Sequence, residues 1–229
     1  MENKVLTQLL KNPFLGKLVT FEGIDGSGKS DQFKMIRDTL LLVKDTNVIF
    51  TKEPPNNSVG VGIYDILRGR HPSITLESIS EIEMQRKYFL GRRMQYQDLY
   101  LPTLRAGVHV VSDRGLVSVA YGIKNIEELN QFMMVQKAMF DYYRVPLITP
   151  DLNLIFDVPV EVALERLGKK ERDKDKFEQQ ERLEIARANY LAIGQEIPNC
   201  VIINGNRSVE DVFVDTKRYV FQLLGLQDQ

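Results

Sequence analysis

The chain has 229 residues, with 43% hydrophobic and 27% charged residues, which is an ordinary balance for one folded domain with a sizeable core. Its formal net charge of −1 argues against a general affinity for nucleic acid or for an anionic membrane surface, and no apolar run reaches the roughly 20 residues that cross a bilayer. The N-terminus lacks the apolar stretch of a signal peptide, and a single cysteine, Cys200, excludes an internal disulfide framework and suits the cytoplasm.

Residues 1–15 precede the first predicted strand and carry short apolar pairs, so a short amphipathic helix is expected there. An apolar strand at 17–21 then leads into Gly23-Ile24-Asp25-Gly26-Ser27-Gly28-Lys29-Ser30. This Gly-x4-Gly-Lys-Ser pattern between a strand and a helix is typical of a loop that binds nucleoside triphosphates. The glycines let backbone N–H groups surround a polyphosphate, Lys29 supplies positive charge, and Ser30 offers a hydroxyl to Mg²⁺.

Strands and helices alternate along the rest of the chain. After the loop, Phe33, Ile36, Leu40 and Val43 fall on one helix face, and β-branched runs follow at 47–51, 108–112, 152–156 and 200–204. This alternation predicts a parallel sheet with helices on both faces. No repeat or linker marks a second domain, so we expect an N-terminal extension at 1–15 and one domain at 16–229.

The predicted strands end in polar residues, which would meet at one edge of the sheet, where ligands bind in such folds. Asp113 and Asp157 each follow an apolar strand, as an acid serving Mg²⁺ would. Either could instead be a solvated strand end or a helix N-cap, and Asp157 before Val158-Pro159 has the pattern of a cap. The sequence favours Asp113 as the metal-associated carboxylate.

A long helical pattern at 77–105 places Ile82, Arg86, Phe89 and Arg93 on one face. One interpretation is a wall that binds an anion and a ring; the other is that the arginine stems cover apolar surface while their charges reach water. A charged stretch from Glu165 to Arg187 is typical of an exposed helix–loop–helix.

In combination these motifs resemble the thymidylate kinases, which phosphorylate thymidine monophosphate (dTMP). The resemblance covers about residues 16–225, and it rests on the following segments: residues 21–30, Thr51-Lys52-Glu53-Pro54, Phe89 with Arg93, Asp113-Arg114 with Ser118 and Ala120-Tyr121, and Asp175-Lys176-Phe177-Glu178. It implies an α/β P-loop kinase fold: a three-layer arrangement with a five-stranded parallel sheet of order 2-3-1-4-5 and a short lid at about 167–178.

The resemblance also assigns roles, residue by residue. It implies that ATP is bound by Gly23, Asp25, Gly26, Ser27, Gly28, Lys29, Ser30, Asn204 and Arg207. It implies that dTMP is bound by Asp25, Lys52, Glu53, Pro54, Phe89, Arg93, Arg114, Ser118 and Tyr121. Phe89 would stack on thymine, Arg93 would bond it, and Tyr121 would pack under the deoxyribose. Ser30 and Asp113 would serve Mg²⁺, and a cytoplasmic homodimer is expected.

Phosphoryl transfer to a phosphate oxygen needs positioning and positive charge more than a strong base. We expect Lys29, Asp113 and Arg114 to be catalytic. Because the phosphate loop contains no arginine, a lid cation is also expected, and Arg172 is the first choice among Lys169, Lys170, Arg172, Lys174 and Lys176. The interleaved acids of that segment leave a solvated mixed-charge surface as the other interpretation.

Three departures from the family pattern bear on the base. Lys52 stands where arginine is usual, which weakens a bidentate grip on phosphate. The segment 118–121 is one residue short, so Ser118 and Tyr121 do not carry over equally well. Val119 and Gly122 replace residues that are often polar. These departures leave the strictness of thymine selection open.

Other functions are compatible with parts of the pattern. The chain could phosphorylate another pyrimidine monophosphate, or a deoxynucleoside with Glu53 as general base. A nucleotide-dependent switch would need a guanine-reading Asn-Lys-x-Asp segment, which the sequence lacks. A non-catalytic homologue is disfavoured because Lys29, Ser30, Asp113 and Arg114 are all intact.

Overall fold

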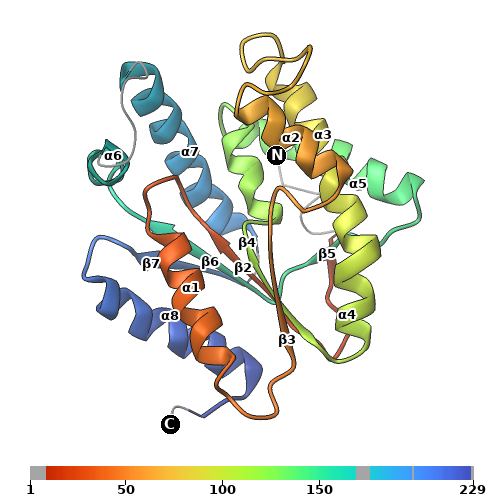
Figure 1. The fold of residues 1–229 in the computed structure, drawn as a ribbon, viewed down its shortest axis with the longest axis vertical. Coiled ribbons are helices and arrows are strands. Elements are labelled where there is room, and N and C mark those ends of the chain that lie inside the picture. The colour runs from red at the N-terminus through yellow and green to blue at the C-terminus, as the bar shows by residue number, and fades with distance from the viewer. Residues whose placement is uncertain (1–8, 169–175, 198, 228–229) are drawn as a thin grey trace.

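The fold is built around a parallel sheet that carries helices on both faces, and the computed structural model describes residues 9–168, 176–197 and 199–227 (Figure 1). The strands are β1 (Leu10–Lys11), β2 (Leu18–Glu22), β3 (Val48–Lys52), β4 (His109–Asp113), β5 (Ile148–Thr149), β6 (Leu152–Asp157) and β7 (Cys200–Asn204). The α-helices are α1 (Lys29–Leu40), α2 (Ser58–Leu67), α3 (Glu81–Gln95), α4 (Leu101–Arg105), α5 (Leu129–Tyr142), α6 (Val160–Gly168), α7 (Lys176–Glu196) and α8 (Val209–Leu224).

The main sheet has five parallel strands in the order β3-β4-β2-β6-β7. Counted along the chain without the short strands β1 and β5, this is the order 2-3-1-4-5, so the predicted topology is confirmed. The predicted strand ranges agree with the observed ones to within one residue. β-branched runs were sufficient here because the central strands are buried on both faces and are therefore largely apolar.

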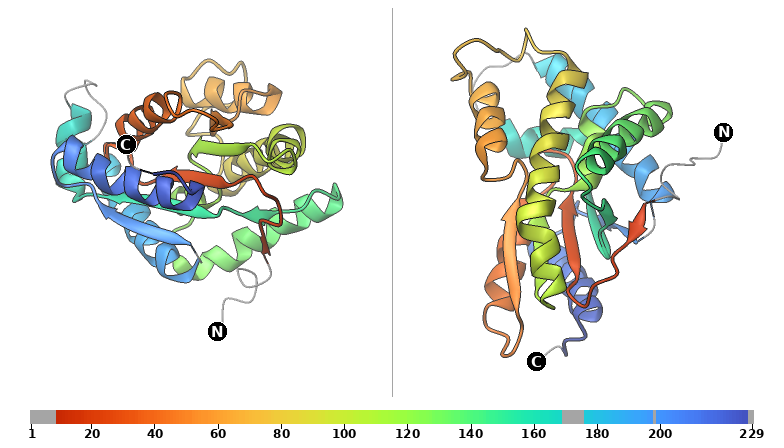
Figure 2. Two further views of the ribbon diagram at one scale, coloured as in Figure 1. Left: turned by 90° about the horizontal axis from the view of Figure 1, so that it is seen from below. Right: turned by 90° about the vertical axis from the view of Figure 1, so that its right-hand side faces the viewer.

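Two apolar clusters fill the spaces on either side of the sheet, and the two views of Figure 2 show the sheet between its helix layers. Val19 and Phe21 of β2 point toward α1 and α8, where Ile36 and Leu40 join the same cluster. Leu18 of β2 points the opposite way, into the cluster formed with α3, α5 and α7. Alternation of side chains along each strand therefore builds both halves of the core.

The N-terminal segment differs from its predicted helix in the part that is described. Leu10 and Lys11 form β1, which pairs in parallel with Ile148 and Thr149 of β5. Asn12 then donates from Nδ2 to a carboxylate oxygen of Asp151, 2.7 Å away. Backbone pairing with a distant strand overrides the weak local helical pattern.

The long helical pattern at 77–105 becomes three connected pieces. A capping box of Ser80 and Glu83 starts α3, a π-helical turn, η2 (Tyr96–Tyr100), follows, and α4 completes the run. Among the described helices, none combines the length and the apolar character of a membrane span.

Candidate active site

The loop between β2 and α1 is shaped by its glycines. Gly26 and Gly28 have φ angles of 83° and 89°, a region that other residues rarely adopt. A Cβ at Gly26 would lie 2.4 Å from the carbonyl oxygen of Ala163 in α6, so only glycine fits this approach. The backbone thus turns tightly and α1 begins at Lys29, with its N-terminal N–H groups facing the loop.

Lys29 and Asp25 bring opposite charges to this loop. Lys29 is 6% exposed, and its Nζ lies 3.4 Å from Oδ1 of Asp25, whose side chain is 55% exposed. Burial of the ammonium, reinforced by repulsion from Arg114, lowers the pKa of Lys29. Burial opposes ionisation of Asp25, but Arg114 and Lys29 outweigh it and hold the pKa of that carboxyl below its ordinary value. The Asp25 carboxyl is therefore ionised at neutral pH.

Asp113 and Ser30 lie together beside the loop, as the sequence predicted. Asp113 Oδ2 is 3.4 Å from Ser30 Oγ. Asp113 Oδ1 is buried and has no hydrogen-bond partner within the described part of the chain. An unpartnered buried carboxylate oxygen next to a hydroxyl suits a hard divalent cation such as Mg²⁺, which prefers oxygen ligands and keeps several of its waters.

Arg114 connects the loop to the neighbouring cleft. Its φ of 73° lies in the left-handed region, and its backbone N–H donates to Phe21 O at 2.9 Å. The guanidinium pairs with Asp25 and donates from Nη1 to Tyr190 Oη at 3.3 Å. It also lies 5.1 Å from the centroid of the Tyr121 ring. A strained backbone that is held by this many contacts points to a functional position for the guanidinium.

A buried carboxyl, Glu22, lies behind Arg114 at the end of β2. Ser118 Oγ donates to its Oε2 at 2.6 Å, and Tyr190 Oη donates to the same oxygen at 3.3 Å. Burial raises the pKa of Glu22 to about 7, although the Ser118 hydrogen bond and the positive charge of Arg114 act in the opposite direction. The sequence analysis assigned no role to this residue, which directly precedes the loop.

A cleft of about 490 Å³ opens next to the phosphate loop, between the sheet edge, α2, α3 and α7. It is lined by residues from each of these elements: Asp25, Glu53, Pro54, Tyr64, Leu67, Leu76, Ile79, Glu81, Met84, Gln85, Tyr88, Arg92, Arg114, Ser118, Tyr121, Arg182 and Leu183. Charged groups and aromatic rings therefore share one cavity beside the triphosphate loop.

Ser118 and Tyr121 both line this cleft, although their spacing is one residue short of the family pattern. They belong to a 3₁₀-helix, η3 (Leu116–Tyr121), in which residues three apart lie on the same side. The Tyr121 hydroxyl accepts the backbone N–H of Asp25 at 2.6 Å. Both residues therefore reach the cleft despite the shorter spacing.

Phe89 and Arg93 do not line the cleft, and their predicted placement is wrong. Phe89 is fully buried and packs edge-to-face on Phe132 of α5, with ring centroids 6.4 Å apart. The Arg93 guanidinium lies 4.2 Å from the centroid of the Tyr143 ring and donates to Gln97. Each side chain is turned toward α5 or its C-terminal end, away from the cavity.

Their places on the cleft face of α3 are taken by Tyr88 and Arg92, one residue earlier and likewise four apart. A shift of one residue turns a helical side chain by about 100° around the axis, so the two faces are not interchangeable. The adjacent pairs Tyr88-Phe89 and Arg92-Arg93 satisfy the same spacing in either register. The spacing is therefore equally compatible with Tyr88 and Arg92 or with Phe89 and Arg93 facing the cleft.

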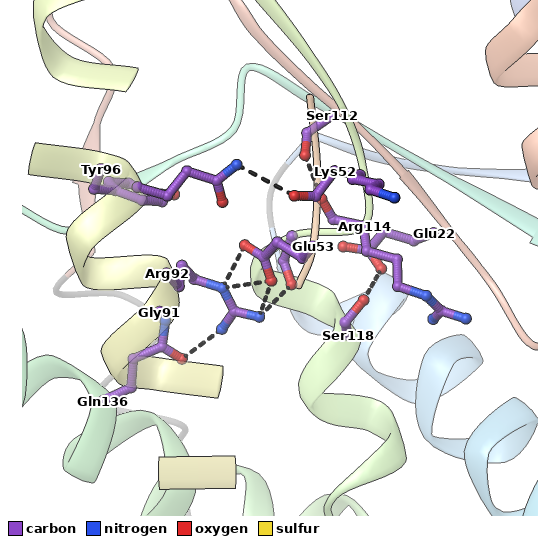
Figure 3. A network of polar contacts seen from close by, with 12 residues as sticks. Glu22, Lys52, Glu53, Gly91, Arg92, Tyr96, Ser112, Arg114, Ser118 and Gln136 are labelled. Atoms are coloured by element: carbon purple, nitrogen blue, oxygen red, sulfur yellow. Dashed lines mark hydrogen bonds and ion pairs between the residues drawn. The ribbon is translucent and has the colours of Figure 1, made fainter. Parts of the chain in front are cut away.

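Arg92 and Glu53 form a buried ion pair at the floor of the cleft (Figure 3). Nε of Arg92 donates to both carboxylate oxygens of Glu53, and Nη2 donates to Oε2 at 2.6 Å. The guanidinium also donates to Gln136 Oε1 of α5 and to the carbonyl oxygen of Gly115. Arg92 thereby joins the end of β3 to α3, α5 and the loop after β4, and it engages both carboxylate oxygens of Glu53.

Other predicted positions are spread around the site. Pro54 lines the cleft, whereas the Lys52 side chain is exposed, with Nζ 5.2 Å from the centroid of the Tyr64 ring. Asn204 is exposed at the end of β7, and Arg207 is exposed in the loop that follows, where it pairs with Asp215. Arg172 and the rest of the predicted lid core at 169–175 lie outside the described residues.

Two cations beside the site were not predicted. Arg166 in α6 donates to the carbonyl oxygens of Gly26 and Gly205, so it links the phosphate loop to the loop after β7. Arg182 in α7 lines the cleft. Both lie within the charged stretch that the sequence marked only as exposed. Asp157, by contrast, forms an ion pair with Arg187, so its carboxylate has a protein partner.

Comparisons with known proteins agree on one family. A sequence model of the family described as Thymidylate kinase matches residues 21–215. The chain is 31% identical to the thymidylate kinase of Thermosipho melanesiensis over 210 residues, which covers 90% of this chain and 98% of the relative. It is 34% identical to the thymidylate kinase of a Janthinobacterium species, over 85% of this chain and 91% of the relative. It is also 29% identical to a probable thymidylate kinase of Methanococcoides burtonii, over 91% of this chain and 98% of that protein.

Proposed function

The chain belongs to the thymidylate kinase family of phosphotransferases, and we propose that it transfers the γ-phosphoryl group of Mg·ATP to dTMP. The product would be the nucleoside diphosphate, a step of nucleotide biosynthesis. The observation that carries the proposal is the position of Arg114, which pairs with Asp25 of the phosphate loop and also lines the adjacent cleft. One guanidinium can thus contact both a donor in the loop and an acceptor phosphate in the cleft.

The proposed step is an in-line displacement. An oxygen of the acceptor phosphate attacks the γ-phosphorus, and the bond to the bridging oxygen breaks, so that ADP leaves. Because that oxygen is already anionic, no strong base is needed, and cations and positioning carry the catalysis. Lys29 and Arg114 are the proposed first contacts with the transferring group, with Arg182 of the cleft and Arg172 of the lid as further cations.

Ser30 and Asp113 are the residues proposed to hold Mg²⁺, and the unpartnered Oδ1 of Asp113 supports that assignment. When bound, the ion would neutralise charge on the donor phosphates. The loop residues 23–30 would hold the ATP phosphates, and Asn204 and Arg207 would lie near the adenine. Arg166 fixes the carbonyl groups of both of these loops.

On the acceptor side, the proposed sugar contacts are Asp25 and Tyr121, with Ser118 and Pro54 nearby in the same cavity. For the base we replace the predicted pair Phe89 and Arg93 by Tyr88 and Arg92, because only the latter line the cleft. Lys52 would act on the acceptor phosphate from its exposed position. Homodimerisation and a cytoplasmic location complete the proposal, and both rest on the resemblance to the family.

A deoxynucleoside kinase is the main rival, since it would use Glu53 as general base. Both Glu53 oxygens accept hydrogen bonds from Arg92 in a buried pair, which argues against that role. The pair gives the Glu53 carboxylate a structural role, because it joins the end of β3 to α3.

The test is a coupled assay of ADP release with Mg·ATP and a panel of acceptors: dTMP, dUMP, dCMP, dAMP and thymidine. We expect turnover with dTMP and none with thymidine. Strong thymidine turnover would overturn the proposal in favour of a nucleoside kinase. A better rate with dUMP or dCMP would keep a monophosphate kinase but replace its acceptor, and calorimetric titration with ATP and GTP would separate a kinase from a GTP-dependent switch.

A further inference from the structure

We propose that Gln85 of α3 reads the edge of the acceptor base; this inference rests on the proposed function. Gln85 lines the cleft with a side chain that is only 6% exposed. Within the described part of the chain, its amide has no hydrogen-bond partner. Buried amides normally have partners, so a partnerless one in a cavity is prepared for a ligand.

Gly122 makes room for this amide. A Cβ at Gly122 would lie 2.2 Å from Cδ of Gln85 and 2.3 Å from its Nε2. Any side chain at position 122 would therefore displace the Gln85 amide from its place beside Tyr121. The polar group that the loop lacks at this point is supplied from α3 instead.

Neighbouring polar groups are already committed to protein partners. A guanidinium has five N–H donors. In Arg92, Nε donates to Glu53. The two Nη2 hydrogens go to Glu53 and to the carbonyl oxygen of Gly115, and one Nη1 hydrogen goes to Gln136. A single Nη1 hydrogen remains. The hydroxyl of Ser118 is likewise used by Glu22.

The chemistry of an amide suits the imide edge of thymine. Its carbonyl can accept the N3–H of the base while its NH₂ donates to O4, a bidentate pair of the kind that distinguishes bases. Gln85, Tyr88 and Arg92 follow one another at positions i, i+3 and i+7 of α3 and therefore share its cleft face. The free amide, the ring and the remaining donor of Arg92 together form one surface for a pyrimidine.

Steady-state kinetics of Gln85→Ala test the assignment, with Gln131→Ala on the exposed surface of α5 as matched control. We expect the dTMP KM to rise roughly 10- to 100-fold, the discrimination typical of a bidentate pair, with kcat and the ATP KM unchanged within about threefold. N3-methyl-dTMP should be a poor acceptor for the wild type. In Gln85→Ala its penalty relative to dTMP should disappear.

Gln85→Glu provides a second readout that does not depend on removing side-chain volume. A carboxylate accepts from the N4 amine of cytosine and repels O4 of thymine. The ratio of kcat/KM for dCMP to that for dTMP should therefore rise about tenfold or more. Near-UV circular dichroism of each variant checks that the fold is retained.

A wild-type penalty for N3-methylation that persists in Gln85→Ala, or an unaltered dCMP preference in Gln85→Glu, would overturn the assignment of Gln85 alone. Absence of dTMP turnover in the wild type would overturn the proposed function, and this inference with it. The two failures are therefore distinct.

Discussion

Glu22 is held without exposure to solvent between Ser118, Tyr190 and Arg114, and its Oε1 has no partner within the described residues. With a folded pKa of about 7, against an ordinary value of 4.5, the folded chain binds more protons than the unfolded chain between these two pH values. Stability must then fall as the pH rises through this window and stay lower above it.

We therefore expect Glu22→Gln to abolish this dependence. Between pH 4.5 and 7, the free energy of unfolding of the wild type should fall relative to that of the variant, by on the order of 3 kcal/mol in total. Urea unfolding of both proteins at pH 5, 6, 7 and 8 measures this difference. Glu127→Gln, at an exposed carboxylate, is the control, and parallel profiles for Glu22→Gln and the wild type would contradict the buried-acid argument.

Substitution of Arg93 and of Arg114 should have different effects on catalysis, because only Arg114 lines the cleft. The sequence pattern expects Arg93→Ala to weaken dTMP binding, whereas the structure predicts dTMP kinetics within about threefold of the wild type. Arg114→Ala should lower kcat by roughly 100-fold or more, as the loss of a preorganised transition-state cation does. Steady-state assays of both variants test this difference. A tenfold rise of the dTMP KM in Arg93→Ala would favour Phe89 and Arg93 as the base contacts, as the sequence predicted.

Among the elements, α6 contributes to the proposed donor site in a way that its sequence did not reveal. Arg166 donates to Gly26 O at 3.3 Å and to Gly205 O at 3.1 Å, so one side chain fixes the phosphate loop against the loop after β7. Hydrogen bonds from a charged donor are each worth about 1.5–3 kcal/mol. Their loss should loosen the ATP-binding loops and leave the acceptor cleft intact.

Arg166→Ala is accordingly expected to raise the ATP KM by roughly 3- to 10-fold, because part of the lost hydrogen-bond energy is spent in holding the loops. The dTMP KM should not change. The matched control is Arg37→Ala in the last turn of α1, whose guanidinium pairs with Asp38 at the surface. Equal rises in both Michaelis constants would show that Arg166 supports the whole fold and not the donor loops in particular.

For the molecule as a whole, the two apolar clusters share one sheet. Leu18 of β2 belongs to one cluster and Val19 to the other, and the same division recurs in β4 and β6. If the sheet came apart on one side, the apolar side chains of both clusters would be exposed to water. Residues 16–229 should therefore unfold together, as the prediction of a single domain requires.

Differential scanning calorimetry should give one transition whose calorimetric and van't Hoff enthalpies agree. Scans at several protein concentrations would separate dissociation of a dimer from unfolding of its subunits, since only the former depends on concentration. Two resolved transitions that do not respond to concentration would indicate two independent domains and would contradict the shared-sheet argument.

The sequence by itself determined the sheet and the donor side of the site. Strand ranges and the phosphate loop followed from patterns that depend on neighbours in the chain: β-branched runs, and glycines where the backbone needs positive φ. The strand order followed from the resemblance to the thymidylate kinases. Lys29, Ser30, Asp113 and Arg114 lie where these patterns put them, because they sit at strand ends whose direction the topology fixes.

Only the tertiary structure decided which face of α3 meets the cleft. Tyr88-Phe89 and Arg92-Arg93 fit the spacing in either register, and packing of Phe89 on Phe132 of α5 selects one of them. The ion pair of Arg92 with Glu53 and the packing of Gln85 against Gly122 likewise join residues far apart in the chain. Periodicity records that a helix has two faces, but only the partners that pack against it determine which residues are left to bind a ligand.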